Sequence, residues 1–367
     1  MNGTLNQASH QWATRPADER FTSLTEMLQH FKTMRSNSRQ LTVASRELEV
    51  APSADHKGLT LHRKTAGASA SSAAPTHWSF GQLAARAEAP AGYLRTMPAE
   101  IAADCINYGL QYKRQIEDVG LLLYRNGSVS ARAITGPTYG RIWNADIVQG
   151  LTERFGDGFN GDWKVPGEFK KDLSEVTKEN TTLFGGDRDM FVFLADEKNR
   201  VEIPNRRDGQ AGTLGRGFFV WNSEVGAATF GVATFLFDYV CCNRIVWGAK
   251  EYKQVTIRHT PKAPVRWVDE LAPALTAYAN SSTGGITRAI EHARQARIDD
   301  VGKFLTERFG KRMPAILQDV ALAEEGKPIE TLWDAACAVT AHARSILHQD
   351  DRVDLERKAG ALLDMVA

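Results

Sequence analysis

Residues 216–260 read RGFFVWNSEVGAATFGVATFLFDYVCCNRIVWGAKEYKQVTIRHT, and this stretch decides the fold class. Its parts at 217–221, 229–237 and 252–258 are rich in aromatic and β-branched residues, which favour β-strands. Residues 190–194 upstream have the same composition. The middle of the chain is therefore predicted to form a mainly antiparallel sheet.

Helices and one hairpin are expected before this sheet. Residues 119–124 and 129–135 flank Asn126-Gly127, the strongest short-range signal for a hairpin turn. Residues 142–155 carry apolar side chains at helical spacing and meet Gly156, a residue typical of a left-handed helix end. The combination predicts an α+β protein with helices flanking a central sheet.

The rest of the chain suggests three regions. Residues 66–75, AGASASSAAP, form a low-complexity stretch typical of a flexible linker. Residues 264–367 have helical periodicity almost throughout. We therefore expect an N-terminal extension and linker at 1–76, a central α+β domain at 77–263 and a helical C-terminal module at 264–367.

The hexapeptide LTERFG occurs twice, at residues 151–156 and 305–310. The flanking residues of the two copies do not match, so the hexapeptide does not indicate a repeat architecture. Each copy ends in glycine after an apolar periodic stretch, which predicts two separate helix ends.

Composition bounds the compartment and the partners. The 45 Lys and Arg against 44 Asp and Glu leave a net charge of +1, so any nucleic-acid site has to be local. Four scattered cysteines do not form a disulfide framework and indicate a reducing compartment. Neither a secretory leader nor an apolar run long enough for a membrane is visible, which predicts a cytoplasmic protein without a membrane partner.

The standard catalytic signatures are missing. The chain holds no GxxxxGK[ST], GxGxxG, HExxH, CxxC or GxSxG motif, and its nine histidines are dispersed. We therefore assign no catalytic residue, metal ligand or cofactor, and a binding protein is favoured over an enzyme. His259, beside Arg258, could contact an anion, but a solvated residue at a strand edge is the favoured interpretation.

Two arrangements of acids and lysines loosely resemble the pattern of metal-dependent nucleases, in which carboxylates hold a divalent ion. The same spacing is also usual for solvent-facing strand residues. The two sets are Asp162 with Glu168 and Lys170, and Asp238 with Glu251 and Lys253.

Basic and aromatic residues interleave between 206 and 258, starting with a glycine-rich run that offers backbone N–H groups to a phosphate. Such mixtures supply phosphate contacts and base-stacking surfaces for single strands, although alternate strand positions point into a core. The predicted nucleic-acid-binding residues are Arg206, Arg207, Arg216, Trp221, Arg244, Trp247, Lys250, Tyr252, Lys253 and Arg258.

Several ordered segments resemble the phage/plasmid-like family known as domain of unknown function 932. They are WNSEVG at 221–226, VCCNR at 240–244 and RHT at 258–260, with FGQL at 80–83, Tyr93-Leu94, RAIT at 132–135 and Tyr139 upstream. The resemblance covers about residues 78–260. It implies an origin in a mobile element and no established activity.

Residues 147–165, IVQGLTERFGDGFNGDWKV, are similar to a segment of single-strand annealing recombination proteins. Phe155, Gly156, Asn160, Gly161 and Trp163 carry the similarity, with looser spacing at Asp157-Gly158. It implies a sheet backed by a helix, assembly into rings or filaments, and DNA in a basic groove. The same residues also fit a plain helix end, a glycine-rich turn and a buried strand.

These observations favour ATP-independent binding of single-stranded nucleic acid, with DNA annealing, by a homo-oligomer of phage or plasmid type. A metal-dependent nuclease is the first alternative. A protein-interaction factor that binds a host protein and inhibits a host defence system is the second.

Overall fold

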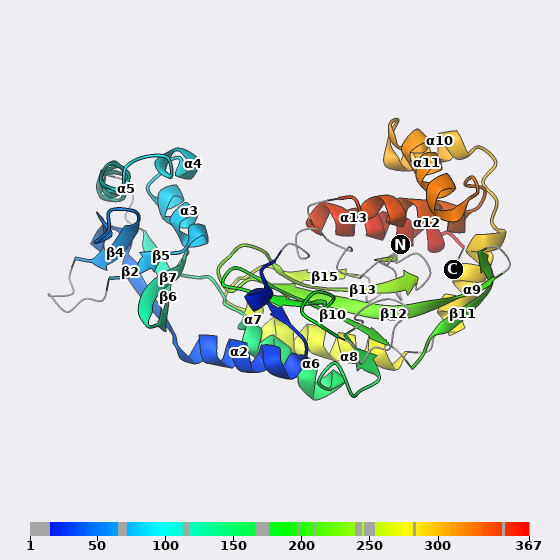
Figure 1. The fold of residues 1–367 in the computed structure, drawn as a ribbon, viewed down its shortest axis with the longest axis horizontal. Coiled ribbons are helices and arrows are strands. Elements are labelled where there is room, and N and C mark those ends of the chain that lie inside the picture. The colour runs from blue at the N-terminus through cyan, green and yellow to red at the C-terminus, as the bar shows by residue number, and fades with distance from the viewer. Residues whose placement is uncertain are drawn as a thin grey trace.

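The computed structural model describes residues 15–64, 72–112, 117–165, 176–196, 198–207, 210–238, 244–245, 254–281, 284–346 and 349–366. It confirms an α+β fold with a large antiparallel sheet, flanking helices and a helical C-terminal cluster (Figure 1). Among the helices of these ranges, none combines the length and the apolar character that crossing a membrane requires.

The large sheet has nine strands within the described residues, and its central path runs β1-β9-β10-β12-β13-β14. Every pairing in it is antiparallel, and β8, β11 and β15 pair with β10, β12 and β13. The strands are β1 (Arg20–Phe21), β8 (Trp163–Lys164), β9 (Leu183–Gly185), β10 (Met190–Asp196), β11 (Val201–Arg207), β12 (Gln210–Asn222), β13 (Phe230–Asp238), β14 (Arg244–Ile245) and β15 (Gln254–Ile257).

Alternation along β12 divides its side chains between two cores. Phe218 and Val220 belong to a large core with α2 (Leu24–Ser36), α6 (Asn144–Phe155), α7 (Ala263–Arg266) and α8 (Ala272–Asn280), where a π-helical turn, Trp267–Leu271, joins α7 to α8. Phe219 and Trp221 belong to a separate aromatic cluster. Successive strand residues point to opposite sides of the sheet, and a cluster of buried residues covers each side of β12, so both sets of side chains are buried.

A smaller sheet, β2-β6-β7-β5, forms what we call the N-terminal unit, residues 38–135 (Figure 1). Its strands are β2 (Ser38–Ala44), β6 (Asp118–Asn126), β7 (Ser128–Thr135) and β5 (Ala74–Pro75), with the hairpin β3 (Leu48–Pro52) and β4 (Leu59–Arg63) beside them. The helices α3 (His77–Arg86), α4 (Ala91–Leu94) and α5 (Ala99–Tyr112) complete the unit. Residues assigned to the N-terminal extension by sequence, in β2, thus pair with β6.

The predicted hairpin is confirmed. β6 and β7 pair antiparallel around Gly127, whose φ of 72° lies in the left-handed region that glycine adopts without strain. Both LTERFG copies end helices, as predicted. Gly156 follows α6 and Gly310 follows α10 (Val301–Phe309), with φ values of 81° and 92°.

The C-terminal module contains α9 (Gly284–Gln295), α10, α11 (Met313–Glu325), α12 (Leu332–Ala343) and α13 (Gln349–Leu363). Its apolar core is centred on α12 and includes Val201 and Ile203 of β11 with Leu214 of β12. Figure 1 shows α12 and α13 on one side of the large sheet and α7 and α8 on the other. The predicted helical module therefore packs directly against sheet residues.

Candidate functional site

Residues 222–227, at the end of β12 and in the connection that leads to β13, contact the N-terminal unit, and we call them the loop of residues 222–227. Trp78 and Gln82 of α3 both donate to the carbonyl oxygen of Val225, at 3.0 and 2.7 Å. The hydroxyl of Tyr139 donates to the carbonyl of Ser223 at 2.7 Å. Segments that are far apart in the sequence, and that carry the resemblance described above, therefore meet at one place.

A buried ion pair anchors the loop. Arg132 of β7 donates from Nη1 to Oε2 of Glu224 at 2.9 Å, and both side chains are almost fully inaccessible. The other oxygen of Glu224 accepts from the backbone N–H of Asn144, where α6 begins. The side-chain amide of Asn222 donates to Asn144 Oδ1 and to the carbonyl of Ile142. These hydrogen bonds fix the loop to β7 and to the start of α6.

Five side chains next to this loop form a continuous stack of cations and aromatic rings. The guanidinium carbons of Arg35 and Arg141 lie 5.2 and 5.9 Å from the ring centre of Trp143. Arg141 also lies 5.3 Å from the ring of Tyr139, which stacks on His259 at 4.7 Å and 21°. We call these residues the cation–aromatic stack. It runs from an exposed arginine at the end of α2 to a half-buried histidine after β15.

Arg141 is the unusual member of the stack. Only 7% of the residue is exposed, and within the described residues no carboxylate lies within ion-pair distance of it. Its Nε donates to Gln40 Oε1 at 3.2 Å, whereas Nη1 is buried without a hydrogen-bond partner. Burial lowers the pKa of Arg141 to about 10, so the side chain is still cationic at neutral pH. The stack therefore holds a buried positive charge with an unused donor.

His259 is held as a neutral side chain. Its Nδ1 donates to the carbonyl of Gly140 at 3.0 Å, while Nε2 is buried without a partner. Burial lowers the pKa of His259 below its ordinary value, and the nearby Arg141 acts in the same direction. The two segments approach so closely that a Cβ on Gly140 would lie 1.8 Å from the carbonyl oxygen of Thr260. Glycine is required there by close backbone contact.

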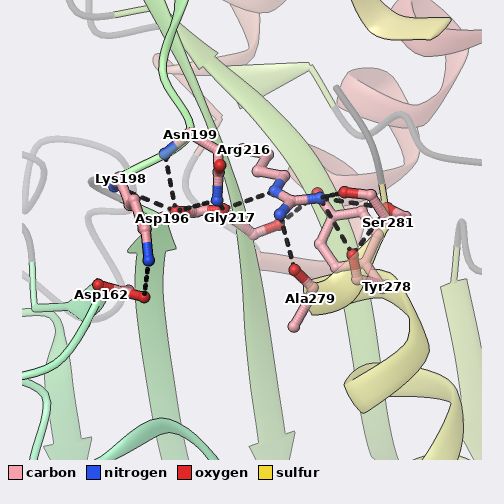
Figure 2. Close-up of polar contacts among 9 residues, drawn as sticks. All are labelled: Asp162, Asp196, Lys198, Asn199, Arg216, Gly217, Tyr278, Ala279 and Ser281. Atoms are coloured by element: carbon pink, nitrogen blue, oxygen red, sulfur yellow. Dashed lines mark hydrogen bonds and ion pairs between the residues drawn. The ribbon is translucent and has the colours of Figure 1, made fainter. Parts of the chain in front are cut away.

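Two of the residues predicted to bind nucleic acid lie in the interior. Arg216 is 2% exposed, and Figure 2 shows its guanidinium between Asp196 and the end of α8. It donates to Asp196 Oδ2 at 2.7 Å and to the carbonyls of Tyr278, Ala279 and Ser281. Trp221 is 8% exposed within the aromatic cluster of the sheet. Both residues have structural partners where the sequence predicted surface contacts.

The other predicted residues are placed as follows. Arg258 is exposed and precedes His259 of the stack. The backbones of Arg206, Arg207 and Arg244 are in β11 and β14, and their side chains lie outside the described part of the structure. Trp247, Lys250, Tyr252 and Lys253 lie outside the described residues.

The acidic sets do not assemble a metal site within the described ranges. Asp162 is exposed and forms an ion pair with Lys198 at 3.2 Å (Figure 2). Glu168, Lys170, Glu251 and Lys253, and the side chain of Asp238, lie outside the described residues. In the part of the chain that the structure describes, no group of three or more His, Cys, Asp or Glu side chains is arranged to hold a metal ion.

Sequence reasoning missed Arg35, Arg141 and Trp143. The stretch Tyr139-Gly140-Arg141-Ile142-Trp143 contains the same alternation of basic and aromatic residues that drew attention to residues 206–258. Arg35 carries no such signal because its partner, Trp143, is distant in sequence and only the fold brings the two together. Comparison with protein-family models, with curated proteins and with solved structures finds no match for the chain.

Proposed function

We propose that the protein binds single-stranded nucleic acid without ATP, at the cation–aromatic stack. One observation carries the proposal, which is the buried guanidinium of Arg141, whose Nη1 has no hydrogen-bond partner. A phosphate of the strand would accept a hydrogen bond from this guanidinium, and an unpaired base would lie beside the half-buried ring of Trp143.

The energetics of Arg141 favour an anionic ligand. An uncompensated charge in a protein interior costs several kcal/mol, because the lost hydration is not replaced by a partner. Most buried charges are therefore paired. The negative charge of Glu224 acts on Arg141, but both oxygens of this carboxylate are already engaged by Arg132 and by the backbone of Asn144. A phosphate oxygen would supply both the missing charge and the missing acceptor.

The surroundings of the stack support a strand rather than a small anion. Arg39 and Arg258 are exposed close in sequence to Gln40 and His259, which touch the stack or belong to it. Arg35 is 43% exposed at the outer end, where it lies over the ring of Trp143 and forms an ion pair with the exposed Asp146. Several separated cations suit the repeating phosphates of a backbone. An aromatic ring between them favours single strands, because bases in a duplex have no free faces.

The annealing part of the proposal rests on the two sequence resemblances. Annealing proteins of that kind hold one strand in a basic groove and assemble as oligomers. We therefore include DNA annealing by a homo-oligomer of phage or plasmid type in the proposed function.

A salt titration with labelled oligothymidylate tests the binding proposal. Fluorescence anisotropy should show binding at low salt and a linear fall of log affinity with log salt concentration, because each phosphate contact releases counterions. Arg141→Met should weaken binding by roughly tenfold or more, since a charge-assisted hydrogen bond is lost. Absence of wild-type binding at low salt would overturn the proposal.

Matched variants separate the site from general electrostatics. Lys303→Ala removes an exposed cation of α10 and should leave the affinity within about twofold, because a single remote charge adds little beyond the Debye length. Arg141→Lys keeps the charge and loses the planar fork, so it should bind with intermediate affinity. Circular dichroism confirms that each variant is folded before its affinity is compared.

A further inference from the structure

A separate cleft lies in the N-terminal unit, between the strands β4 and β5 and the helices α3, α4 and α5. Its volume is about 470 Å³, which is within the usual range for small-molecule sites. His77 and Phe80 of α3 line it, whereas Trp78 and Gln82 of the same helix contact the loop of residues 222–227. The cleft and the loop therefore lie on different faces of one helix.

The cleft is basic. Lys57 and Arg95 are exposed residues of its lining, and His77 also lines it. His56 also lines the cleft, but its Nδ1 lies 2.6 Å from Glu100 Oε1 and is already engaged. None of the described residues that line the cleft is an aspartate or a glutamate. Two cations without a carboxylate in the lining favour an anionic ligand.

The planar guanidinium of Arg95 is held in place by two contacts. Its guanidinium carbon lies 4.9 Å from the ring centre of Phe80, and its Nη2 donates to the carbonyl of His77 at 2.9 Å. A guanidinium fixed over an aromatic ring presents its other face as a planar stacking surface. Apolar side chains complete the walls, namely Leu59, Leu94, Met97, Ala99 and Ala102. The cleft thus combines a planar cation, an apolar wall and a free lysine.

We propose that this cleft binds a nucleoside monophosphate, either as a free nucleotide or as one nucleotide of a strand. The heterocycle would stack on the Arg95 guanidinium and against the apolar wall, and the phosphate would contact Lys57. This inference goes beyond the cation–aromatic stack, since it concerns different residues in the N-terminal unit.

Isothermal titration calorimetry of the whole protein with adenosine monophosphate tests the inference. Adenosine and inorganic phosphate are the comparison ligands, and each should bind at least about tenfold more weakly, because each keeps only half of the contacts. Arg95→Ala should lower the affinity for adenosine monophosphate by about tenfold or more, since both the stacking surface and the charge are lost. The affinity of Arg95→Lys should be nearly as low, because lysine restores the charge but not the planar guanidinium.

Lys64→Ala is the matched control, because Lys64 is an exposed cation of the same unit outside the cleft. Its affinity for adenosine monophosphate should be unchanged. Equal losses of affinity in Lys64→Ala and Arg95→Ala would overturn the inference. Inorganic phosphate that binds as tightly as adenosine monophosphate would also overturn it.

A labelled oligonucleotide distinguishes the two sources of the nucleotide. If Arg95→Ala lowers the affinity for adenosine monophosphate and not for the oligonucleotide, the ligand is a free nucleotide. If it lowers the affinity for the oligonucleotide, alone or together with that for adenosine monophosphate, the cleft also accepts one nucleotide of a strand. An effect on neither overturns the inference. Strand binding that depends on Arg141 and not on Arg95 would leave the proposed function standing, so the two failures are distinguishable.

Discussion

Arg216 on β12 donates through Nε to Oδ2 of Asp196 on β10 over 2.7 Å, with both side chains inside the protein. The same guanidinium donates to three carbonyls at the carboxyl end of α8. A cation at this end of a helix also stabilises the helix dipole. One buried arginine therefore connects two sheet strands to the first long helix of the C-terminal region.

Removing Asp196 should strongly destabilise the fold. In Asp196→Ala, the buried guanidinium of Arg216 loses its one carboxylate partner among the described residues, which typically costs about 3–5 kcal/mol of unfolding free energy. Asp162→Ala, which breaks a pair that is 60% exposed at the aspartate, should cost below about 1 kcal/mol. Urea unfolding measures both. Similar losses in the two variants would contradict a structural role for the buried pair.

Gly231 should not tolerate a side chain. Trp221 pairs with Gly231 across β12 and β13, and a Cβ on the glycine would lie 2.0 Å from Cζ2 of the indole. Gly231→Ala should therefore displace Trp221 and lower the unfolding free energy by about 1–3 kcal/mol. Gly285→Ala in α9 meets nothing within 4 Å and should be neutral or stabilising. Thermal unfolding that ranks the two variants in the opposite order would refute this packing.

Stability should fall as the pH drops from 7 toward 5. The pKa of His259 is lowered by burial, so the unfolded chain takes up a proton near pH 6.5 that the folded protein does not. The unfolding free energy is therefore highest above this pH and decreases until the pH passes the folded pKa. His30 and His342, whose pKa values are also lowered by burial, act in the same direction.

His259→Gln should reduce this pH dependence without abolishing it. The amide can still donate to the carbonyl of Gly140, but it does not titrate. Urea unfolding at several pH values between 5 and 8 gives the slope for the variant and the wild type. A variant slope equal to that of the wild type would show that His259 does not contribute.

The fold class was predictable because local signals agreed with the tertiary arrangement. The Asn-Gly turn fixes the β6–β7 hairpin, and the two hexapeptides end helices because Gly156 and Gly310 adopt positive φ values. The aromatic segments formed the strands of the large sheet. Periodicity alone did not assign each strand to a sheet, since β2 pairs with β6 across about 80 residues of intervening chain.

The candidate site was less predictable, because side-chain type does not determine burial. Arg216 and Trp221 belong to the mixture of basic and aromatic residues that indicates nucleic-acid binding, yet both are interior. Side chains along a strand alternate between the two faces of the sheet, but this alternation does not show which of them are buried until it is known that the sheet is covered on both sides. The stack formed by Arg35, Trp143 and Arg141 joins residues from different segments, which a single sequence does not pair.

Arg141→Met should stabilise the protein while weakening its binding of single strands. Methionine has a similar length, fills the space between Trp143 and Tyr139, and removes a buried charge that has no carboxylate partner among the described residues. Replacing buried charged groups by apolar side chains of similar volume is often stabilising, here by about 1–3 kcal/mol. Replacing a functional residue that is kept at the expense of stability raises the stability and lowers the binding affinity. Replacing a purely structural arginine lowers both.

Urea unfolding and anisotropy with labelled oligothymidylate, on the same preparations, check this prediction. Arg132→Met is the matched comparison, because it also replaces a buried arginine near the loop but leaves Glu224 buried without its partner. That variant should lose about 3–5 kcal/mol of unfolding free energy. If Arg141→Met is destabilised as much as Arg132→Met, Arg141 contributes to the fold as a structural residue, and its unused donor is not a site held open for a phosphate.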